Sequence, residues 1–418
     1  MKIIFGTPYI YSKKVKRGTV NTSGLAFGPL KIAEKYGELG HSVFIITQSQ
    51  YGKETKLGLN CWMKKKTIFD IIKSLNITYI RAAITLIKKM KVNVKTALRI
   101  LLYFANGAYF ERSIKQVSPD AVNIHSVGLY TIPFIMACVR TKTKFLVTQH
   151  GTDQYEIREG NIYRTLDRET CEMLRLLCEN DVRMSMISTG SKLWLESFIG
   201  RPLNNISIIV NPISLVPEEF TPIDHVEKKY IISTGRIGER KNQIQSVRAY
   251  ELLPEYLKKQ YSLVFVGGGV EGSEAKKYVD DKKVSGVIFT DFISKSELLS
   301  YYNKSKIVVV ASLLEGFGMS MLEGYAFGIP VVAFADLDAI PDVYSEEAMI
   351  KVEERTDEAL SKSIQYALEK DWDPKAIRSN INKFTLNKIG KQYIEELKIS
   401  TISNLQESDL FDYFRNKK

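Results

Sequence analysis

Short apolar runs alternate with amphipathic stretches along most of the 418-residue chain, which predicts repeated strand–helix units. In the first half, such runs predict strands at 2–6, 43–47, 121–125, 145–149, 184–188 and 206–210, and a helix at 26–39. A second, more regular series predicts strands at 230–234, 262–266, 287–290, 307–310 and 330–333. Strands that alternate with helices in this way are typical of parallel sheets. The pattern therefore predicts an α/β protein with two doubly wound, Rossmann-like domains.

The two series are separated by a stretch without an apolar period. Residues 211–229 contain three prolines and several charges, as linkers do. We therefore expect an N-terminal domain at 1–212, a linker at 213–229 and a C-terminal domain at 230–383. Residues 384–418 are expected to form a C-terminal helix that can pack back on the N-terminal domain, followed by a polar tail.

Cysteine usage and hydropathy favour a cytoplasmic protein. The four cysteines contain no C-x-x-C pair and lie in apolar stretches, so neither a disulfide framework nor a zinc knuckle is expected. The first residues, MKIIFGTPYIYS, indicate a buried strand rather than a signal peptide. No uncharged apolar stretch approaches the roughly 18 residues of a membrane-spanning helix. We expect a cytoplasmic chain that can lie on the inner face of the plasma membrane.

The net charge of +12 is concentrated in residues 61–115, which hold twelve lysines and arginines against two acids. Apolar residues recur at helical spacing among these bases: Ile80, Ile84, Ile87, Leu98, Leu101 and Leu102. This pattern fits helices that lie on anionic lipid headgroups, and it equally fits ordinary amphipathic helices with solvated lysines. No nucleic-acid partner is expected, because no reader motif accompanies the charge.

Candidate chemistry begins directly after the predicted strand at 307–310, in the sequence ASLLEGFGMSMLEGYAFGIPVVA. Glycines 316 and 318 let the backbone pass close to a ligand, and the N–H groups of a helix N-terminus beside them can bind an anion. Glu315 and Glu323 flank this turn, and carboxylates suit sugar hydroxyls, as they do in dinucleotide-binding folds.

Two further loops are expected at the same sheet edge, because parallel strands end their carboxyl termini together. The sequence GRIGERKNQ follows the strand at 230–234 and supplies Arg236 and Lys241, two cations that could hold a diphosphate. Three consecutive glycines, 267 to 269, follow the strand at 262–266, so Gly267 and Gly268 can admit a nucleotide close to the backbone.

Together these motifs resemble the family 4 glycosyltransferases (glycosyltransferase group 1) of GT-B architecture. The resemblance is carried by G-R-x4-K, the triple-glycine turn and, above all, E-G-F-G-x4-E-G-x-A-x-G-x-P-V-V-A, and it extends from about residue 2 to residue 398. It implies two Rossmann-like domains that face each other across a cleft. It also implies that Arg236 and Lys241 contact the donor diphosphate and that Glu323 contacts the nucleotide ribose.

For the donor sugar, the resemblance implies contacts from Glu315 and from the backbone of Phe317 and Gly318, beside Gly316. The N-terminal half matches more loosely through S-G-L-A-F-G and V-T-Q-H-G-T-D. These stretches would place Gly24 in a glycine loop at the donor.

The second of these stretches would place His150 near the hydroxymethyl group of the sugar. His125 ends the predicted strand at 121–125 and is expected to line the cleft as an acceptor contact. Lys13 and Arg17, in the basic first loop, are also expected on the acceptor side.

The implied activity is transfer of a hexosyl or N-acetylhexosaminyl group, with retained configuration, from a UDP- or GDP-sugar. The acceptor would be a glycan or lipid-linked hydroxyl in bacterial surface polysaccharide or glycolipid biosynthesis. Asp336 and Asp338 form a D-x-D, but two cations already suit the diphosphate, so neither a metal nor a cofactor is expected. Two alternatives stay open: a non-catalytic GT-B subunit that assists a partner transferase, and a nucleotide-sugar epimerase.

Overall fold

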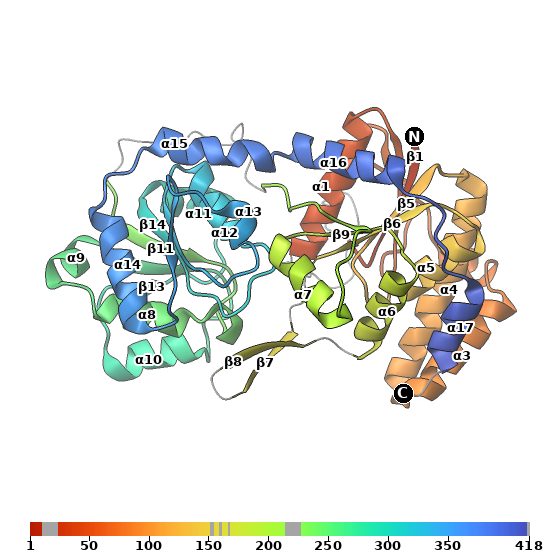
Figure 1. The fold of residues 1–418 in the computed structure, drawn as a ribbon, viewed down its shortest axis with the longest axis horizontal. Helices are drawn as coiled ribbons and strands as arrows, with labels where there is room; N and C mark the ends of the chain where they lie inside the picture. The colour runs from red at the N-terminus through yellow and green to blue at the C-terminus, as the bar shows by residue number, and fades with distance from the viewer. Residues whose placement is uncertain (11–23, 151–153, 159–160, 166–167, 214–226, 416–418) are drawn as a thin grey trace.

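The computed structural model describes residues 1–10, 24–150, 154–158, 161–165, 168–213 and 227–415. Two α/β halves lie side by side along its long axis (Figure 1). The strand order is β10-β9-β6-β5-β1-β2-β4-β3 in the first sheet and β13-β12-β11-β14-β15-β16 in the second. The predicted α/β class with two Rossmann-like domains is confirmed.

The N-terminal sheet is parallel except where β3 pairs with β4. Its strands are β1 (Lys2–Thr7), β2 (Ser42–Thr47), β3 (Thr55–Gly58), β4 (Cys61–Met63), β5 (Ala121–His125), β6 (Phe145–Gln149), β9 (Met184–Met186) and β10 (Ile206–Ile208). Every residue of β5 and β6 is buried, as expected for central strands covered on both faces. All six strands predicted in this half are present, and β3 and β4 were not predicted.

The helices of this half are α1 (Gly24–Glu38), α2 (Ile68–Ile72), α3 (Ile77–Met90), α4 (Val94–Val117), α5 (Ile132–Arg140), α6 (Arg168–Glu179) and α7 (Thr189–Ile199). Thr67, Asn76 and Asn93 cap the N-termini of α2, α3 and α4 with their side-chain oxygens, which fixes where each helix begins. A separate hairpin consists of β7 (Gln154–Arg158) and β8 (Asn161–Thr165).

The C-terminal sheet is parallel throughout. Its strands are β11 (Tyr230–Thr234), β12 (Ser262–Val266), β13 (Val287–Phe289), β14 (Ser305–Val310), β15 (Val331–Phe334) and β16 (Met349–Val352). The helices are α8 (Gln243–Glu251), α9 (Glu255–Gln260), α10 (Glu274–Lys282), α11 (Lys295–Asn303), α12 (Met319–Ala326), α13 (Ile340–Val343) and α14 (Asp357–Glu369). The five predicted strands are present. Strand β16, at one edge of the sheet, was not predicted.

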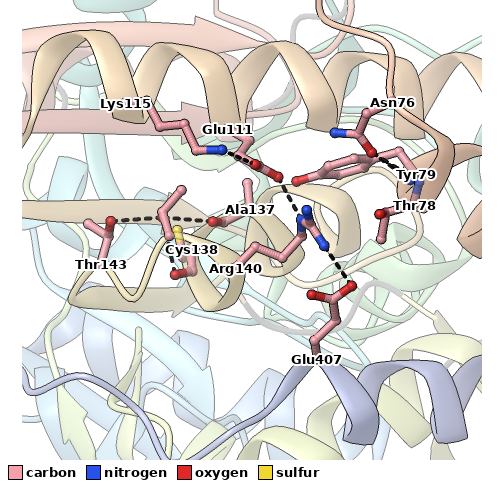
Figure 2. Close-up of polar contacts among 11 residues, drawn as sticks. Asn76, Thr78, Tyr79, Glu111, Lys115, Ala137, Cys138, Arg140, Thr143 and Glu407 are labelled. Atoms are coloured by element: carbon pink, nitrogen blue, oxygen red, sulfur yellow. Dashed lines mark hydrogen bonds and ion pairs between the residues drawn. The ribbon is translucent and has the colours of Figure 1, made fainter.

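The last helices, α15 (Pro374–Ser379), α16 (Leu386–Ile399) and α17 (Glu407–Arg415), lead back to the N-terminal half (Figure 1). Helix α16 packs against α1, and α17 packs against α3, α5 and α6. Arg140 of α5 donates to Glu111 at 2.8 Å and to Glu407 of α17 at 2.6 Å (Figure 2). Helix α17 lies in the polar tail, where the sequence pattern did not predict a helix.

The basic segment 61–115 forms β4, α2, α3 and most of α4, and not all of its charge faces solvent. Lys66 is buried, and its Nζ donates to the carbonyl of Gln48 and to Asn106 Oδ1, each at 3.0 Å. Lys89 is also turned inward, where it pairs with Glu169 and Glu172. Within the described parts of the chain, no helix is both long and apolar enough to cross a bilayer.

Candidate active site

The loop after β14 holds the first pair of expected site residues. Lys241 Nζ lies 2.6 Å from Glu315 Oε2, and Ser312 Oγ donates to the same oxygen at 3.0 Å. Lys241 follows β11 and Glu315 follows β14, and these strands are neighbours in the sheet. The parallel topology thus brings together two residues that lie 74 positions apart.

Glu315 is ionised in this environment. Burial opposes its ionisation, but the charges of Lys241 and Arg240, with hydrogen bonds from Lys241 and Ser312, hold its pKa below the ordinary value. The side chains of Lys241 and Glu315 are only 16% and 10% exposed, so the pair is largely removed from water. Such a pair interacts strongly with any charge that enters the site.

Glu323 lies on α12 and is oriented by a residue that the sequence pattern did not single out. The Tyr302 hydroxyl donates to Glu323 Oε2 at 2.6 Å and lies 3.0 Å from Thr234 Oγ1, at the end of β11. Burial, followed by the charge of Glu323, raises the pKa of Tyr302 well above its ordinary value. Tyr302 therefore stays protonated and can always donate to Glu323.

The triple-glycine turn packs directly on the loop that carries Arg236. A Cβ atom on Gly267, which has φ +148°, would lie 2.1 Å from the carbonyl oxygen of Gly235. A Cβ atom on Gly269, which has φ +96°, would lie 2.7 Å from the Ile237 carbonyl oxygen and 3.6 Å from Arg236 Cγ. Only glycine allows this approach of the two backbones. Arg236 itself is exposed beside the turn.

The other glycines near the site serve close packing as well. A Cβ atom on Gly268 would lie 2.1 Å from the ring of Phe292. Gly318 precedes α12 with φ +70°, where a side chain would be strained. The Phe317 ring is buried against Phe384, which leaves the backbone of Phe317 as the part of this residue that can meet a ligand.

His150 connects the two halves at this point. A Cβ atom on Gly316 would lie 3.6 Å from the His150 carbonyl oxygen, so the Glu315 loop lies against the end of β6. His150 Nε2 lies 2.7 Å from His125 Nδ1. Burial lowers the pKa of His150 to about 4, and burial together with the charge of His150 lowers that of His125. Both rings are neutral at neutral pH.

His125 is completely buried and stacks on Phe5 with the ring centroids 4.3 Å apart. A ring without exposed surface cannot contact an acceptor. The expectation that His125 lines the cleft is therefore wrong, because β5 is a central strand and its last side chain lies behind His150. The ring supports His150 instead.

The D-x-D carboxylates take part in protein contacts. Arg355 donates to both oxygens of Asp336 at 2.7 Å. Asp338 accepts from Ser191 Oγ at 3.1 Å, and Asp342 accepts from the backbone N and the Oγ1 of Thr189, so both acids hold the start of α7 in the other half. The described residues contain no group of three or more potential metal-ligating side chains.

Three expected site residues cannot be assessed from side-chain contacts. Lys13 and Arg17 lie outside the described residues. Gly24 is the first residue of α1, and its proximity to a donor remains a prediction. The residues that sequence reasoning missed are Tyr302, Ser312 and Arg240, whose roles depend on side-chain interactions with Glu323 and Glu315 in the folded chain.

Two parallel-sheet domains with these loops at the facing ends define the GT-B fold. The apo structure of the lipopolysaccharide outer core galactosyltransferase WaaB matches 95% of this chain and 99% of its own, with a TM-score of 0.63 and 14% identity. At that identity, the likeness concerns the fold alone.

The profile of the glycosyl transferases group 1 matches residues 217–384, which include Arg236, Lys241, Glu315 and Glu323. The match places residues 217–384 in that family. An uncharacterized glycosyltransferase of Haemophilus influenzae is 25% identical over 237 residues, 56% of this chain and 62% of the relative. The serotype-specific mannosyltransferase WbdA of Escherichia coli is 30% identical over 161 residues, 34% of this chain and 19% of WbdA. The chain thus spans less than two thirds of these relatives.

Proposed function

We propose that this chain is a retaining glycosyltransferase that moves a hexosyl or N-acetylhexosaminyl group from a UDP- or GDP-sugar to an acceptor hydroxyl. One observation carries the proposal: Lys241 meets Glu315 at 2.6 Å at the carboxyl edge of the C-terminal sheet, where Gly316 adjoins His150 of the other domain. A cation and a carboxylate from distant stretches thereby meet in a loop that lies against the backbone of His150. Ligands of open parallel sheets bind at this edge.

In the proposed reaction, Arg236 and Lys241 bind the diphosphate of the donor. Negative charge grows on this group as it leaves, and preorganised cations stabilise charge that develops in the transition state. These side chains do for the diphosphate what a metal ion does elsewhere, so the proposal includes no metal. Glu323, which Tyr302 holds in place, accepts hydrogen bonds from the ribose.

The donor sugar contacts Glu315 and the backbone around Gly316, Phe317 and Gly318, while Gly267 and Gly268 leave room for the nucleotide. We assign no nucleophile of the protein. The acceptor oxygen attacks from the face that the diphosphate leaves, and the departing phosphate helps to take the acceptor proton. Contact between the two domains aligns donor and acceptor and excludes water.

His150 is proposed to bind the hydroxymethyl group of the sugar through Nδ1, because its Nε2 faces His125. The bond to His125 fixes the ring orientation and the tautomer, and a neutral ring suits a hydroxyl partner. This role differs from that of a general acid, since a pKa of about 4 leaves His150 without the second ring proton that an imidazolium would donate at neutral pH.

The proposed acceptor is a glycan or a lipid-linked glycan of bacterial surface polysaccharide or glycolipid biosynthesis. The name of WbdA, a serotype-specific mannosyltransferase, supports this class. Residues 61–115 are proposed to contact an anionic membrane surface, which would give access to a lipid-linked acceptor. No nucleic-acid partner is proposed.

A donor screen tests the proposal. The melting temperature of the wild-type protein should rise with one class of nucleotide sugar, because a ligand that binds only the folded state stabilises it. Lys241→Ala and Arg236→Ala should lower or abolish this rise, whereas Lys277→Ala, an exposed lysine outside the site, should not. If both site variants respond to donors as the wild type does, the diphosphate role is refuted.

Product analysis separates the alternatives. A transferase, given its donor without acceptor, should slowly hydrolyse it and release the sugar and the nucleoside diphosphate. An epimerase would return a different nucleotide sugar, and a non-catalytic subunit would leave the donor unchanged. Either of the last two results, with every donor tested, would exclude transferase activity.

A further inference from the structure

Exposed apolar side chains are concentrated on three helices of the N-terminal domain. Of 22 large apolar side chains exposed among the described residues, eleven lie between positions 68 and 102. They are Ile68, Phe69, Ile72, Leu75, Ile77, Ile80, Ile84, Val94, Leu98, Leu101 and Leu102. Contiguous apolar patches that are rimmed by polar residues mark interaction sites. We call the surface formed by α2, α3 and α4 the α2–α4 face.

A groove of about 420 Å³ lies in the middle of this face. Its lining comes from α2, α3, α4 and the α2–α3 connection, and it consists of isoleucine, leucine, alanine, phenylalanine and tyrosine side chains. Leu75, Ile80 and Leu101 line the groove and remain 43%, 37% and 38% exposed. A groove of this composition suits a hydrocarbon chain, which needs no hydrogen-bond partner and gains about 0.8 kcal/mol for each methylene removed from water.

Basic side chains surround the apolar residues. Seven of them are exposed between positions 65 and 99: Lys65, Lys73, Arg81, Lys88, Lys91, Lys95 and Arg99. The sequence between 64 and 102 contains one acid, Asp70, and its carboxylate accepts from Thr67 at the start of α2. Among the described residues, no ion pair joins one of the seven bases to an acid, although Lys65 interacts electrostatically with Asp70. Unneutralised bases around an apolar centre complement an anionic lipid surface.

The arrangement within each helix also fits a membrane interface. In α3, Ile77, Ile80 and Ile84 form an outward row, and Arg81 and Lys88 lie in the adjacent row. Long basic side chains can cover apolar surface while their charges reach lipid headgroups. A protein partner would instead be expected to meet polar groups that form hydrogen bonds around an apolar core. The charge and the groove together favour lipid.

We infer that the α2–α4 face binds an anionic bilayer and that the groove takes up one hydrocarbon tail of an anionic membrane lipid. The inference extends the proposed contact between residues 61–115 and a membrane. It rests on the proposed function in one respect, because the lipid-linked acceptor gives the protein a reason to bind a membrane. The helices would lie on the bilayer, since no described helix can span it.

The outward residues lie outside the buried core of the domain, so we expect the fold to tolerate changes there. The inner side of α3 is formed by Tyr79, Ala82, Ala83 and Leu86, which are buried in the domain core. Substitutions of exposed residues away from such cores usually change stability little. We therefore choose the double variant Leu75→Asn with Leu101→Asn for the groove. Leu252→Asn, at a leucine that is 53% exposed in the C-terminal domain, is the matched control.

The first measurement is flotation of the full chain with vesicles at low salt. Wild type and Leu252→Asn should float with phosphatidylglycerol–phosphatidylcholine vesicles and much less with pure phosphatidylcholine. The groove variant should partition roughly tenfold more weakly, because it loses apolar contacts worth at least about 1.4 kcal/mol. Absence of wild-type flotation, or equal flotation of the groove variant, overturns the inference.

The second measurement distinguishes one tail in a groove from general adsorption. Dodecyl phosphate, below its critical micelle concentration, should saturate wild type and Leu252→Asn at one molecule per chain in a calorimetric titration. The groove variant should show no saturable binding. Failure of the wild type to bind, or the same binding by the groove variant, would exclude the tail site.

One result would assign the α2–α4 face to a contact between protein chains instead of a contact with lipid. If the wild type is a dimer in lipid-free solution and the groove variant is a monomer, the face joins two copies of the chain and the inference is overturned.

Donor-induced thermal shifts are measured in the same proteins without lipid. Lost lipid binding with normal donor shifts contradicts this inference alone, whereas normal lipid binding without any donor shift contradicts the proposed transferase alone.

Discussion

At the residue scale, the contact between Lys241 and Glu315 determines how substitutions at either residue affect stability and activity. Glu315 is held as a carboxylate in a largely dry position by the charge of Lys241. Removing one partner of such a pair leaves the other charge uncompensated, whereas a neutral isostere keeps its hydrogen bonds. Stability and activity should therefore respond differently to the two sides of the pair.

We expect Lys241→Met to lower the free energy of unfolding by about 2 kcal/mol, since it leaves a buried carboxylate without its cation. Glu315→Gln should lower it by less than about 1 kcal/mol, because the amide oxygen can still accept from Ser312 and Lys241. Urea denaturation measures both values. Equal stability losses in the two variants would contradict this difference between the two sides of the pair.

The histidine pair predicts a dependence of stability on pH. His150 has a pKa of about 4 in the folded protein, against 6.5 in an unfolded chain, because desolvation of the half-buried ring disfavours its charged form. As the pH falls below about 6.5, the unfolded chain takes up a proton that the folded protein does not accept until about pH 4, so the free energy of unfolding decreases over this window. The contribution of His150 is fully present above pH 6.5.

His150→Gln should weaken this dependence, because glutamine does not titrate. Melting temperatures of wild type and variant, recorded from pH 7 down to pH 4.5, provide the measurement. The two curves should converge as the pH falls. Parallel curves would mean that His150 is not held neutral by the fold.

At the element scale, the sequence pattern found the central strands and the edge strands β10 and β13, but it missed the short strands β3, β4 and β16. Strands β5 and β6 are continuous apolar runs, since helices cover both sides of a parallel sheet. The missed edge strands β3 and β16 are only four residues long, and each contains a lysine. Runs of this length that include a charged residue do not stand out from loops by pattern alone.

Helix α17 was missed for a related reason. Its sequence, ESDLFDYFR, is mostly polar, yet Leu410 and Phe414 are fully buried beneath it. A short helix of this kind is stabilised by the surface that it covers, in this case α3, α5 and α6. Neither that surface nor the ion pair of Arg140 with Glu407 can be read from local sequence (Figure 2).

We expect Phe414→Ala to lower the free energy of unfolding of the N-terminal domain by about 3 kcal/mol, because a buried aromatic ring is lost. The ring packs edge-on against Phe104 of α4, with the centroids 5.6 Å apart. Asp412→Ala, at an exposed position of the same helix, is the matched control. Thermal unfolding that is unchanged by Phe414→Ala would show that α17 does not stabilise the domain.

At the scale of the whole molecule, the sequence located the site through loops that follow parallel strands. Glu315, Glu323, Arg236 and Lys241 could be selected because each lies just after a strand or at the helix that follows one. Tyr302 could not, because it lies at the end of α11 and reaches Glu323 only through the fold. The buried position of His125 depends likewise on strand order. Roles in donor binding remain predictions for all of these residues.

The most direct test of the account is a crystal structure of the protein with its nucleoside diphosphate sugar. We predict the diphosphate between Arg236 and Lys241, the ribose at Glu323, and the sugar between Glu315 and His150. The nucleotide bound away from the ends of β11 and β14, with these side chains arranged as in the free protein, would contradict the proposed function.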